Sequence, residues 1–389
     1  MANFTADIAN LEELKYYPLT LAEDIRGEPL QFLCVSQNEI QRVVTLDSSG
    51  TTAQPKRLFF TRDDQELTID FFQVGMSTFT DPGDRVLILL PCERPGSVGD
   101  LLAIALERMG VNSIRHGLVR DVGHTLAVMA NAGVDGVVGI PTQVLALVRN
   151  VGLKNSNQLR VKSVLLSTDH VPQAIVTAIE ASWGCKVYNH YGMTEMGLGG
   201  GVECQARRGY HLRDADLYME IIDAISGETV SEYEYGEIVF TTLTRRGMPL
   251  IRYRTGDISR FIPGTCPCGT ALRTLEKVRS RITNRVDLGN GNCLTMADLD
   301  DALFPINGVS DFTASISRQD KMDRLYVKVC GTEETDACIV QQTVETIPEV
   351  RLAIESDRLH VVSVIQSEEA FVFAGQGKRI LADKRPVCD

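Results

Sequence analysis

The sequence contains no apolar run near the roughly 20 residues that a membrane-spanning helix requires. It also has no excess of basic residues, since 39 lysines and arginines stand against 51 aspartates and glutamates, for a formal net charge of −12. Proteins that bind a nucleic-acid backbone usually carry basic patches, so this balance argues against a nucleic-acid partner. The N-terminal segment carries acidic residues and lacks the apolar core of a secretion signal. We therefore expect a cytoplasmic protein without a membrane partner.

The composition is that of a globular enzyme. Hydrophobic residues make up 44% of the chain and charged residues 23%, and 389 residues are enough for two or three domains. In a cytoplasm, the ten cysteines are expected to be reduced thiols or metal ligands.

Apolar, strand-like runs alternate with helix-like segments between Asp84 and Tyr191, which predicts a parallel sheet covered on both faces. From Asp216 to Phe240 the pattern changes to alternating strands of an antiparallel subdomain, and the charged stretch Lys277–Thr283 resembles a hinge. We predict an α/β fold: a large N-terminal domain (1–280) with the parallel sheet and the antiparallel subdomain, and a small mobile α+β C-terminal lobe (281–389).

A turn rich in hydroxyl groups is the first candidate site. Its backbone N–H groups and hydroxyls suit an anion such as a phosphate, although no Walker spacing is present. A polar hairpin turn is the alternative. The residues concerned are Ser48, Ser49, Gly50, Thr51, Thr52 and Lys56.

Two further segments follow predicted strands. The string Tyr188–Glu195 comes after a strand of the parallel series, at the edge where ligands of such sheets bind. Its aromatic ring could cover a purine and its carboxylate could hold magnesium, or both could be ordinary core and loop residues. The string Arg252–Asp257 offers an acid that could accept bonds from two ribose hydroxyls, although Thr-Gly-Asp is also a common turn.

Three cysteines and one histidine have the composition of a tetrahedral zinc site. The alternative is that they are unrelated loop residues. They are Cys204, His211, Cys266 and Cys268.

The strings SSGTT…PK, YGMTE and RYRTGD occur in the order and spacing of the adenylate-forming superfamily. YGMTEMG, GEIVFTTL, PLIRYRTGD and CPCG resemble its phenylacetate–CoA ligase branch, which also has similar cysteines. The resemblance runs from about residue 40 to the C-terminus. It implies an AMP-forming acid–thiol ligase that uses ATP and Mg²⁺ to make an acyl-AMP, and then transfers the acyl group to CoA.

The resemblance also implies roles for individual residues. The Ser48–Thr52 turn would hold the β- and γ-phosphates. Tyr191 would stack on adenine, and Gly192 would also belong to the nucleotide site. Thr194 would contact the α-phosphate and Glu195 would bind Mg²⁺. Asp257 and Arg281 would bind the ribose, and Lys378 would be the mobile catalytic lysine. A cation at that point is physically required, because the carboxylate and the α-phosphate are both anions.

The sequence departs from the resemblance in three places. Ala53 and Gln54 replace the usual Gly-Lys, which stiffens the loop and removes a cation; Lys56 partly compensates. Ser167–His170 replaces a Gly-Gly-Glu string beside the expected acid pocket, and the phosphate turn comes early in the chain. The partners are a small carboxylic acid, aromatic or other, and CoA. Alternatives are transfer to a carrier-protein thiol, or a nucleotide-binding protein without turnover, and a homodimer stays open.

Overall fold

The computed structural model describes residues 10–46, 54–150, 159–231, 233–278, 280–319, 322–331, 335–366 and 379–386. Their contacts group the chain into two compact units. The first combines Met1–Gly83, Cys92–Arg115 and Tyr188–Arg279, and the second combines Asp84–Pro91, His116–Val187 and Ser280–Asp389. Each unit is described by itself. The predicted domain division at residues 280 and 281 stays a prediction, as does the mobility of the C-terminal lobe.

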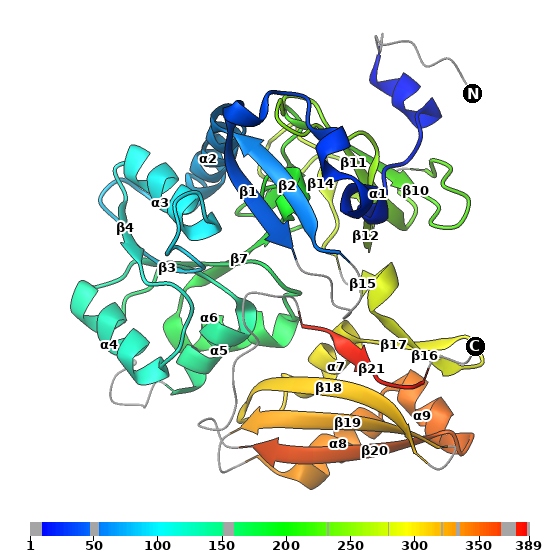
Figure 1. The fold of residues 1–389 in the computed structure, drawn as a ribbon. Helices are drawn as coiled ribbons and strands as arrows, with labels where there is room; N and C mark the ends of the chain where they lie inside the picture. The colour runs from blue at the N-terminus through cyan, green and yellow to red at the C-terminus, as the bar shows by residue number, and fades with distance from the viewer. Residues whose placement is uncertain are drawn as a thin grey trace. The chain divides into compact units, whose positions relative to one another are not determined.

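The first unit is built mainly from antiparallel ladders (Figure 1). β1 and β2 form a hairpin, β10, β11 and β12 form a three-stranded ladder, and β7 continues through β8, β9 and β14 to β13. The strands are β1 (Ile40–Leu46), β2 (Lys56–Thr61), β4 (Asn112–Arg115), β7 (Lys186–Tyr191), β8 (Gly201–Glu203), β9 (Tyr210–Leu212), β10 (Leu217–Ile222), β11 (Gly236–Thr242), β12 (Tyr253–Ser259), β13 (Phe261–Ile262) and β14 (Thr274–Leu275).

The long helix α2 of this unit begins where the sequence supplies capping groups. Thr61 and Asp64 form a reciprocal capping box at the start of α2, each side chain accepting a bond from the other's backbone. The helices are η1 (Leu11–Tyr16), α1 (Ala22–Gly27), η2 (Pro29–Phe32), η3 (Gln37–Glu39), α2 (Arg62–Met76), α3 (Val98–Arg108) and η5 (Thr194–Met196).

One hydrophobic core joins the strands that carry the site motifs. Phe60 on β2, Tyr191 at the end of β7, and Phe240 and Tyr253 on β11 and β12 are all buried in it. Burial of this apolar surface stabilises the unit and fixes the strand ends, so the motif residues beyond those ends have a rigid base.

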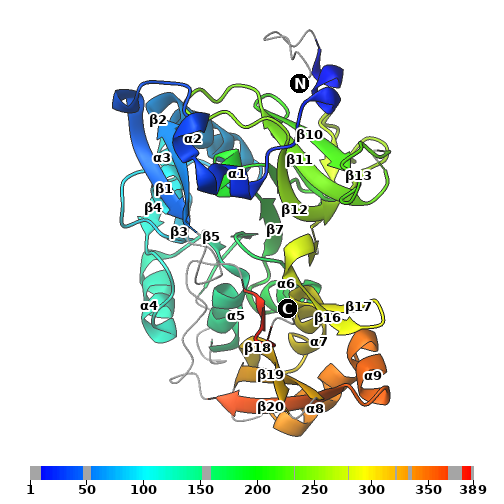
Figure 2. The same cartoon turned by 45° about the vertical axis from the view of Figure 1, so that its right-hand side comes forward.

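The second unit contains the parallel strands that the apolar runs predicted. β3, β5 and β6 pair in parallel, and α4, α5 and α6 alternate with them in sequence (Figure 2). The bounds are β3 (Arg85–Leu89), α4 (Val122–Ala132), β5 (Gly136–Gly139), α5 (Pro141–Asn150), β6 (Ser163–Leu166) and α6 (Gln173–Trp183).

The rest of the second unit contains the hairpin β16–β17 and a mixed sheet with the order β20–β19–β18–β21. β18 and β19 pair antiparallel over a long register, whereas β20 and β21 join in parallel at the two edges. The elements are β15 (Ser280–Arg281), η6 (Ile282–Asn284), β16 (Arg285–Gly289), β17 (Asn292–Thr295), α7 (Met296–Leu303), β18 (Val309–Gln319), β19 (Met322–Gly331), α8 (Ala337–Glu345), α9 (Pro348–Glu355), β20 (Leu359–Gln366) and β21 (Leu381–Asp383).

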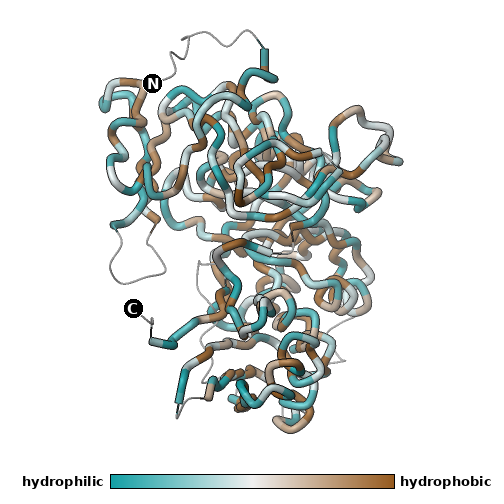
Figure 3. The backbone as a smooth tube through the Cα atoms, turned by 90° about the vertical axis from the view of Figure 1, so that its right-hand side faces the viewer, coloured by the Kyte–Doolittle hydropathy of each residue, from teal (hydrophilic) through white to brown (hydrophobic). Residues whose placement is uncertain are grey.

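Together these elements confirm the predicted α/β fold class, with parallel strands, antiparallel sheets and a C-terminal α+β region. Hydrophobic residues occur in short runs along the chain (Figure 3). Within the described ranges, no helix is long and apolar enough to cross a bilayer.

Candidate nucleotide and metal sites

The predicted phosphate turn leads directly into β2. Ser48, Ser49, Gly50, Thr51 and Thr52 lie outside the described residues, and so does Ala53, so their roles stay predictions. β2 begins at Lys56, whose side chain is only 9% exposed.

Lys56 and Glu195 form a buried ion pair. The ammonium of Lys56 contacts the Glu195 carboxylate and donates a hydrogen bond to the hydroxyl of Tyr253 at 3.0 Å. The Tyr253 hydroxyl in turn donates to Glu195 Oε1 at 3.2 Å. Burial opposes ionisation of Glu195, but the charge of Lys56 holds its pKa below the ordinary value. The carboxylate is therefore ionised and already faces a cation.

The loop that carries Glu195 is held by its backbone as well. Glu195 lies in η5, one turn after β7, and Arg245 donates to its carbonyl oxygen at 2.7 Å and to the Phe59 carbonyl on β2 at 3.2 Å. Gly192, between β7 and η5, has no room for a side chain, because a Cβ would overlap the carbonyl oxygen of Leu198. Arg245 thus ties the glutamate loop to the strand that bears Lys56.

Thr194 is the first residue of η5 and is half-buried, next in sequence to Glu195. Its predicted contact with the α-phosphate stays a prediction.

Tyr191 and Asp257 meet although 66 residues separate them in sequence. The Tyr191 hydroxyl donates to Asp257 Oδ2 at 3.0 Å, and both residues are buried. The Tyr191 ring stacks on Tyr210, with 5.6 Å between the ring centroids. The predicted residues for adenine and ribose are therefore neighbours, while their contacts with a nucleotide stay predictions.

The Thr-Gly-Asp string at 255–257 is not a free turn, as such strings commonly are. It forms an irregularity inside β12. The register with β11 shifts between Glu237 and Val239, and Gly256 has φ +74°, a conformation that favours glycine. Glu237 accepts the Gly256 N–H at 2.9 Å, and the Thr255 hydroxyl accepts the Asp257 N–H at 3.0 Å. This bulge fixes the direction of the Asp257 carboxylate.

The predicted zinc ligands come together in the first unit. The ligand atoms of Cys204, His211, Cys266 and Cys268 all lie within 4.8 Å of one another. Cys204 Sγ is 3.6 Å from Cys266 Sγ, and Cys268 Sγ is 3.4 Å from His211 Nε2. Sulfurs bound to tetrahedral zinc at ~2.3 Å lie about 3.8 Å apart, so these spacings suit the metal.

Two arginine clusters in the second unit hold the last described segment of the chain. The Arg379 side chain is 4% exposed and forms ion pairs with Asp169 at 3.0 Å and Asp300 at 2.8 Å, with Asp311 at 3.8 Å. Its guanidinium also lies over the ring of Phe304. Burial raises the pKa of Asp300 well above its ordinary value, and that of Asp311 to about 6.

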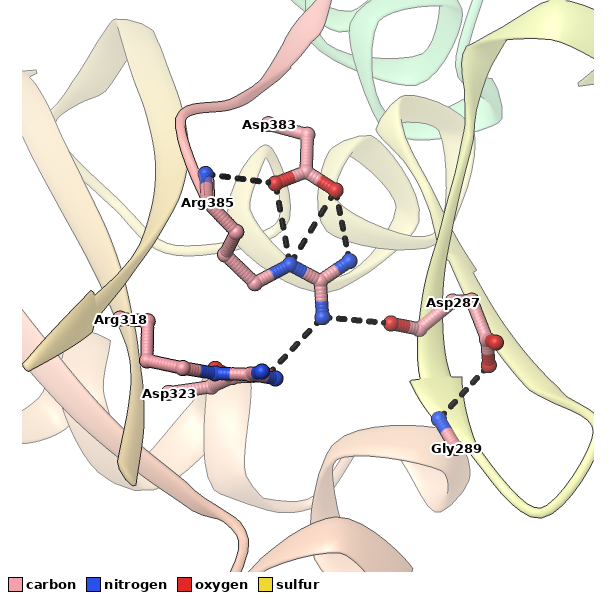
Figure 4. Close-up of polar contacts among 6 residues, drawn as sticks. All are labelled: Asp287, Gly289, Arg318, Asp323, Asp383 and Arg385. Carbon is pink, nitrogen blue, oxygen red and sulfur yellow. Dashed lines mark hydrogen bonds and ion pairs between the residues drawn. The ribbon is translucent and has the colours of Figure 1, made fainter. Parts of the chain in front are cut away.

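The second cluster lies six residues further on. Arg385 binds Asp383 next to it in the chain, Asp323 on β19 at 2.9 Å and the carbonyl of Asp287 on β16 at 2.9 Å (Figure 4). Arg318 binds the same Asp323 carboxylate at 2.7 Å. The segment after residue 378 is therefore anchored at both ends.

The roles of the remaining predicted residues, Arg281 and Lys378, stay predictions. Arg281 lies on β15, in the second unit, and Lys378 lies outside the described residues. Sequence reasoning did not single out Arg245, Tyr253 or Arg379. Tyr253 is inside the RYRTGD string, so its place in that motif could have marked it as a candidate site residue.

The family comparison agrees with this geometry. Residues 41–243, slightly more than half of the chain, match the model of the AMP-binding enzyme family. The chain therefore belongs to that family, within the adenylate-forming superfamily and on its phenylacetate–CoA ligase-like branch.

Curated relatives cover nearly the whole chain. The phenylacetate-coenzyme A ligase of Escherichia coli (strain K12) is 24% identical over 370 residues, covering 90% of this chain and 80% of its own length. The enzyme of that name from Aromatoleum evansii is 26% identical over 410 residues, covering 98% and 87%.

Solved structures share the fold. A 2-hydroxyisobutyryl-CoA ligase in its postadenylation state has a TM-score of 0.78 at 21% identity, covering 97% of this chain and 82% of that one. A benzoate CoA ligase from Burkholderia xenovorans LB400 has a TM-score of 0.59 at 14% identity, covering 84% and 65%.

Proposed function

We propose that the protein is an AMP-forming carboxylic acid:CoA ligase acting on an aromatic or other small acid. The observation that carries the proposal is the joint placement of Glu195 and Lys56, and of Tyr191 and Asp257, in one unit of a chain from the AMP-binding family. The names of the curated relatives supply the reaction class.

In the first step, an oxygen of the acid's carboxylate attacks the α-phosphorus of ATP, and pyrophosphate leaves. Asp257 accepts the ribose hydroxyls, Thr194 donates to the α-phosphate, and Lys378 supplies positive charge where the two anions meet. In the second step, a thiolate attacks the acyl carbon, and AMP leaves. Rotation of the C-terminal lobe about the residues near Arg281 would change the site between the two steps.

Magnesium fits the residues at Glu195. The carboxylate is buried, ionised and already paired with a cation, and one carboxylate plus substrate phosphates is the usual ligand set of Mg²⁺. When bound, the ion would neutralise the phosphate oxygens during pyrophosphate release. Glu195 is the residue that would hold it.

Zinc fits the Cys204–Cys268 cluster, because three thiols and one imidazole form a closed tetrahedral set. The cluster joins the β8 and β9 region to the loop after β13, so its role is structural. We expect zinc to stabilise this part of the first unit without touching the substrate.

A product assay tests the proposal and the choice of acceptor. The protein is incubated with ATP, Mg²⁺ and a panel of aromatic and short aliphatic acids, with CoA or with a phosphopantetheinyl carrier protein. We expect CoA-dependent AMP release and an acyl-CoA detected by mass spectrometry. Acyl transfer to the carrier protein alone would favour the second candidate, and no AMP with any acid would favour a nucleotide-binding protein. A cytoplasmic location stays a prediction.

A further inference from the structure

The buried ion pair of Lys56 and Glu195 joins two residues that belong to the predicted nucleotide site. Lys56 is the first residue of β2, directly after the predicted phosphate turn, and Glu195 is the predicted magnesium ligand. Their side chains are 9% and 6% exposed. The Lys56 ammonium is therefore paired with the same carboxylate that would coordinate a metal ion.

The charge of the buried Arg245 also acts on Glu195, but its guanidinium hydrogen-bonds to backbone carbonyls. Arg245 donates to the backbone carbonyl of Glu195, and Tyr253 contributes a neutral hydroxyl. Among the side chains whose contacts the structure describes, Lys56 is thus the cation in direct ion-pair contact with the Glu195 carboxylate. A carboxylate this deeply buried is costly without a partner, so the pair persists until another cation replaces Lys56.

We infer that Lys56 is an exchangeable counter-ion that holds Glu195 in the metal-free enzyme and yields it to Mg²⁺ when a nucleotide enters. The inference rests on the proposed function for its nucleotide. Displaced from the carboxylate, the ammonium binds the triphosphate. Lys56 is then a positioning residue before nucleotide binding and a phosphate ligand after it.

Electrostatics gives the exchange a direction. Mg²⁺ alone would meet the positive charge of Lys56 at close range in a poorly screened site, which weakens its binding. A nucleotide brings negative charge that attracts both cations, so metal and nucleotide bind together. The structure therefore favours entry of a metal–nucleotide complex over entry of free metal.

The test measures binding of Mn²⁺, used as a paramagnetic probe for Mg²⁺, to the full chain without nucleotide or acid. Four proteins are compared: wild type, Lys56→Met, the double variant Lys56→Met/Glu195→Gln, and Lys328→Met. Lys328 is an exposed lysine on β19 and serves as the matched control. We expect Lys56→Met to bind Mn²⁺ about tenfold or more tightly than wild type, a factor typical of a close charge pair. The control should match wild type, and the double variant should lose the gain.

The same proteins are titrated with a non-hydrolysable ATP analogue in the presence of Mg²⁺. The expected effect on the affinity for the ATP analogue is opposite to the effect on the Mn²⁺ affinity, because Lys56→Met has lost a phosphate contact. We expect Lys56→Met to bind the analogue about tenfold more weakly than wild type, or weaker still. A lysine with only a structural role would not tighten metal binding while weakening nucleotide binding. Unchanged Mn²⁺ affinity in Lys56→Met, or equal gain in the double variant, overturns the inference.

Thermal unfolding covers the case in which Lys56→Met is unstable, since it leaves a buried charge unpaired. Refolding or a raised Tm on adding Mn²⁺, seen in Lys56→Met and not in the double variant, supports the exchange. A Lys56→Met protein that stays unfolded with metal, while the double variant folds, contradicts it. These binding measurements need no turnover, so their failure is distinct from the failure of ligase activity.

Discussion

The hydroxyl of Tyr191 donates a hydrogen bond to the carboxylate of Asp257 at 3.0 Å, joining the end of β7 to the bulge in β12. This bond connects the sequence motif that is predicted to contact adenine with the motif that is predicted to contact the ribose. The bond engages Oδ2 of Asp257, and a carboxylate can accept several hydrogen bonds, as binding of the ribose hydroxyls would require.

The relationship predicts unequal effects of two conservative substitutions. Asp257→Asn replaces an acceptor-only carboxylate with an amide that also donates, so we expect AMP affinity to fall about tenfold or more. Tyr191→Phe keeps the ring and removes the bond to Asp257, so a smaller loss is expected. Calorimetric titration with AMP checks both. Equal affinity of wild type and a folded Asp257→Asn would remove Asp257 from the ribose site.

Lys378 gives a prediction about the two half-reactions. Lys378→Ala removes a preorganised positive charge from the adenylation step, which we expect to slow acyl-AMP formation by roughly 10²–10³. Thiol transfer from a supplied acyl-AMP should stay largely intact, because that step does not bring the two anions together. Single-turnover assays of each half-reaction make the comparison, with Lys384→Ala as the matched control. Normal adenylation by Lys378→Ala would refute the assignment.

Some elements of the fold leave a signal in the sequence, and others do not. Apolar runs such as Arg85–Leu89 predicted β3 because burial on both faces selects such residues, and the strand is present. In the sequence, Arg379 and Arg385 are only two basic residues near the C-terminus, yet aspartates from distant parts of the chain engage both. Pairings at that separation leave no periodic signal in sequence.

In the candidate site, too, the motif residues could be predicted from the sequence, whereas the residues that hold them in place could not. Motif order located Glu195 and Asp257, because their chemistry depends on residue type at fixed spacing. The bulge at Gly256 depends on Glu237, and the position of Arg245 depends on the Phe59 carbonyl. These partners become neighbours only after folding. Candidate site residues can therefore be proposed from a single sequence, whereas the contacts that support them need the structure.

The Arg379 cluster makes stability depend on pH. The folded-state pKa of Asp311 is about 6, above the unfolded value near 3.9, so the folded state binds more protons between these values. Its contribution is therefore present at low pH and is lost as pH rises through 6. Facing it are the cation Arg379 and the acids Asp169 and Asp300, and the pKa of Asp300 is raised in the same direction.

Urea unfolding of wild type and Asp311→Asn across pH 4 to 7 measures this effect. From the pKa shift, we expect the free energy of unfolding of wild type to fall relative to the variant by up to about 3 kcal/mol as pH rises. Parallel pH profiles for the two proteins would show that Asp311 does not carry this titration.

The cysteine cluster predicts bound metal in purified protein. Elemental analysis should find about one equivalent of zinc, and Cys266→Ser should lose it and lower Tm, because the closed ligand set stabilises folding. Cys338→Ser, an exposed thiol on α8, is the control and should keep both metal and Tm. Zinc well below one equivalent in wild type would remove the site.

Acid-dependent exchange of labelled pyrophosphate into ATP measures the central claim most directly, because it reports acyl-AMP formation without any acceptor thiol. The account predicts exchange with at least one aromatic or small acid from a broad panel, dependent on Mg²⁺ and greatly reduced in Lys378→Ala. Folded, nucleotide-binding protein that shows no exchange with any acid would contradict it.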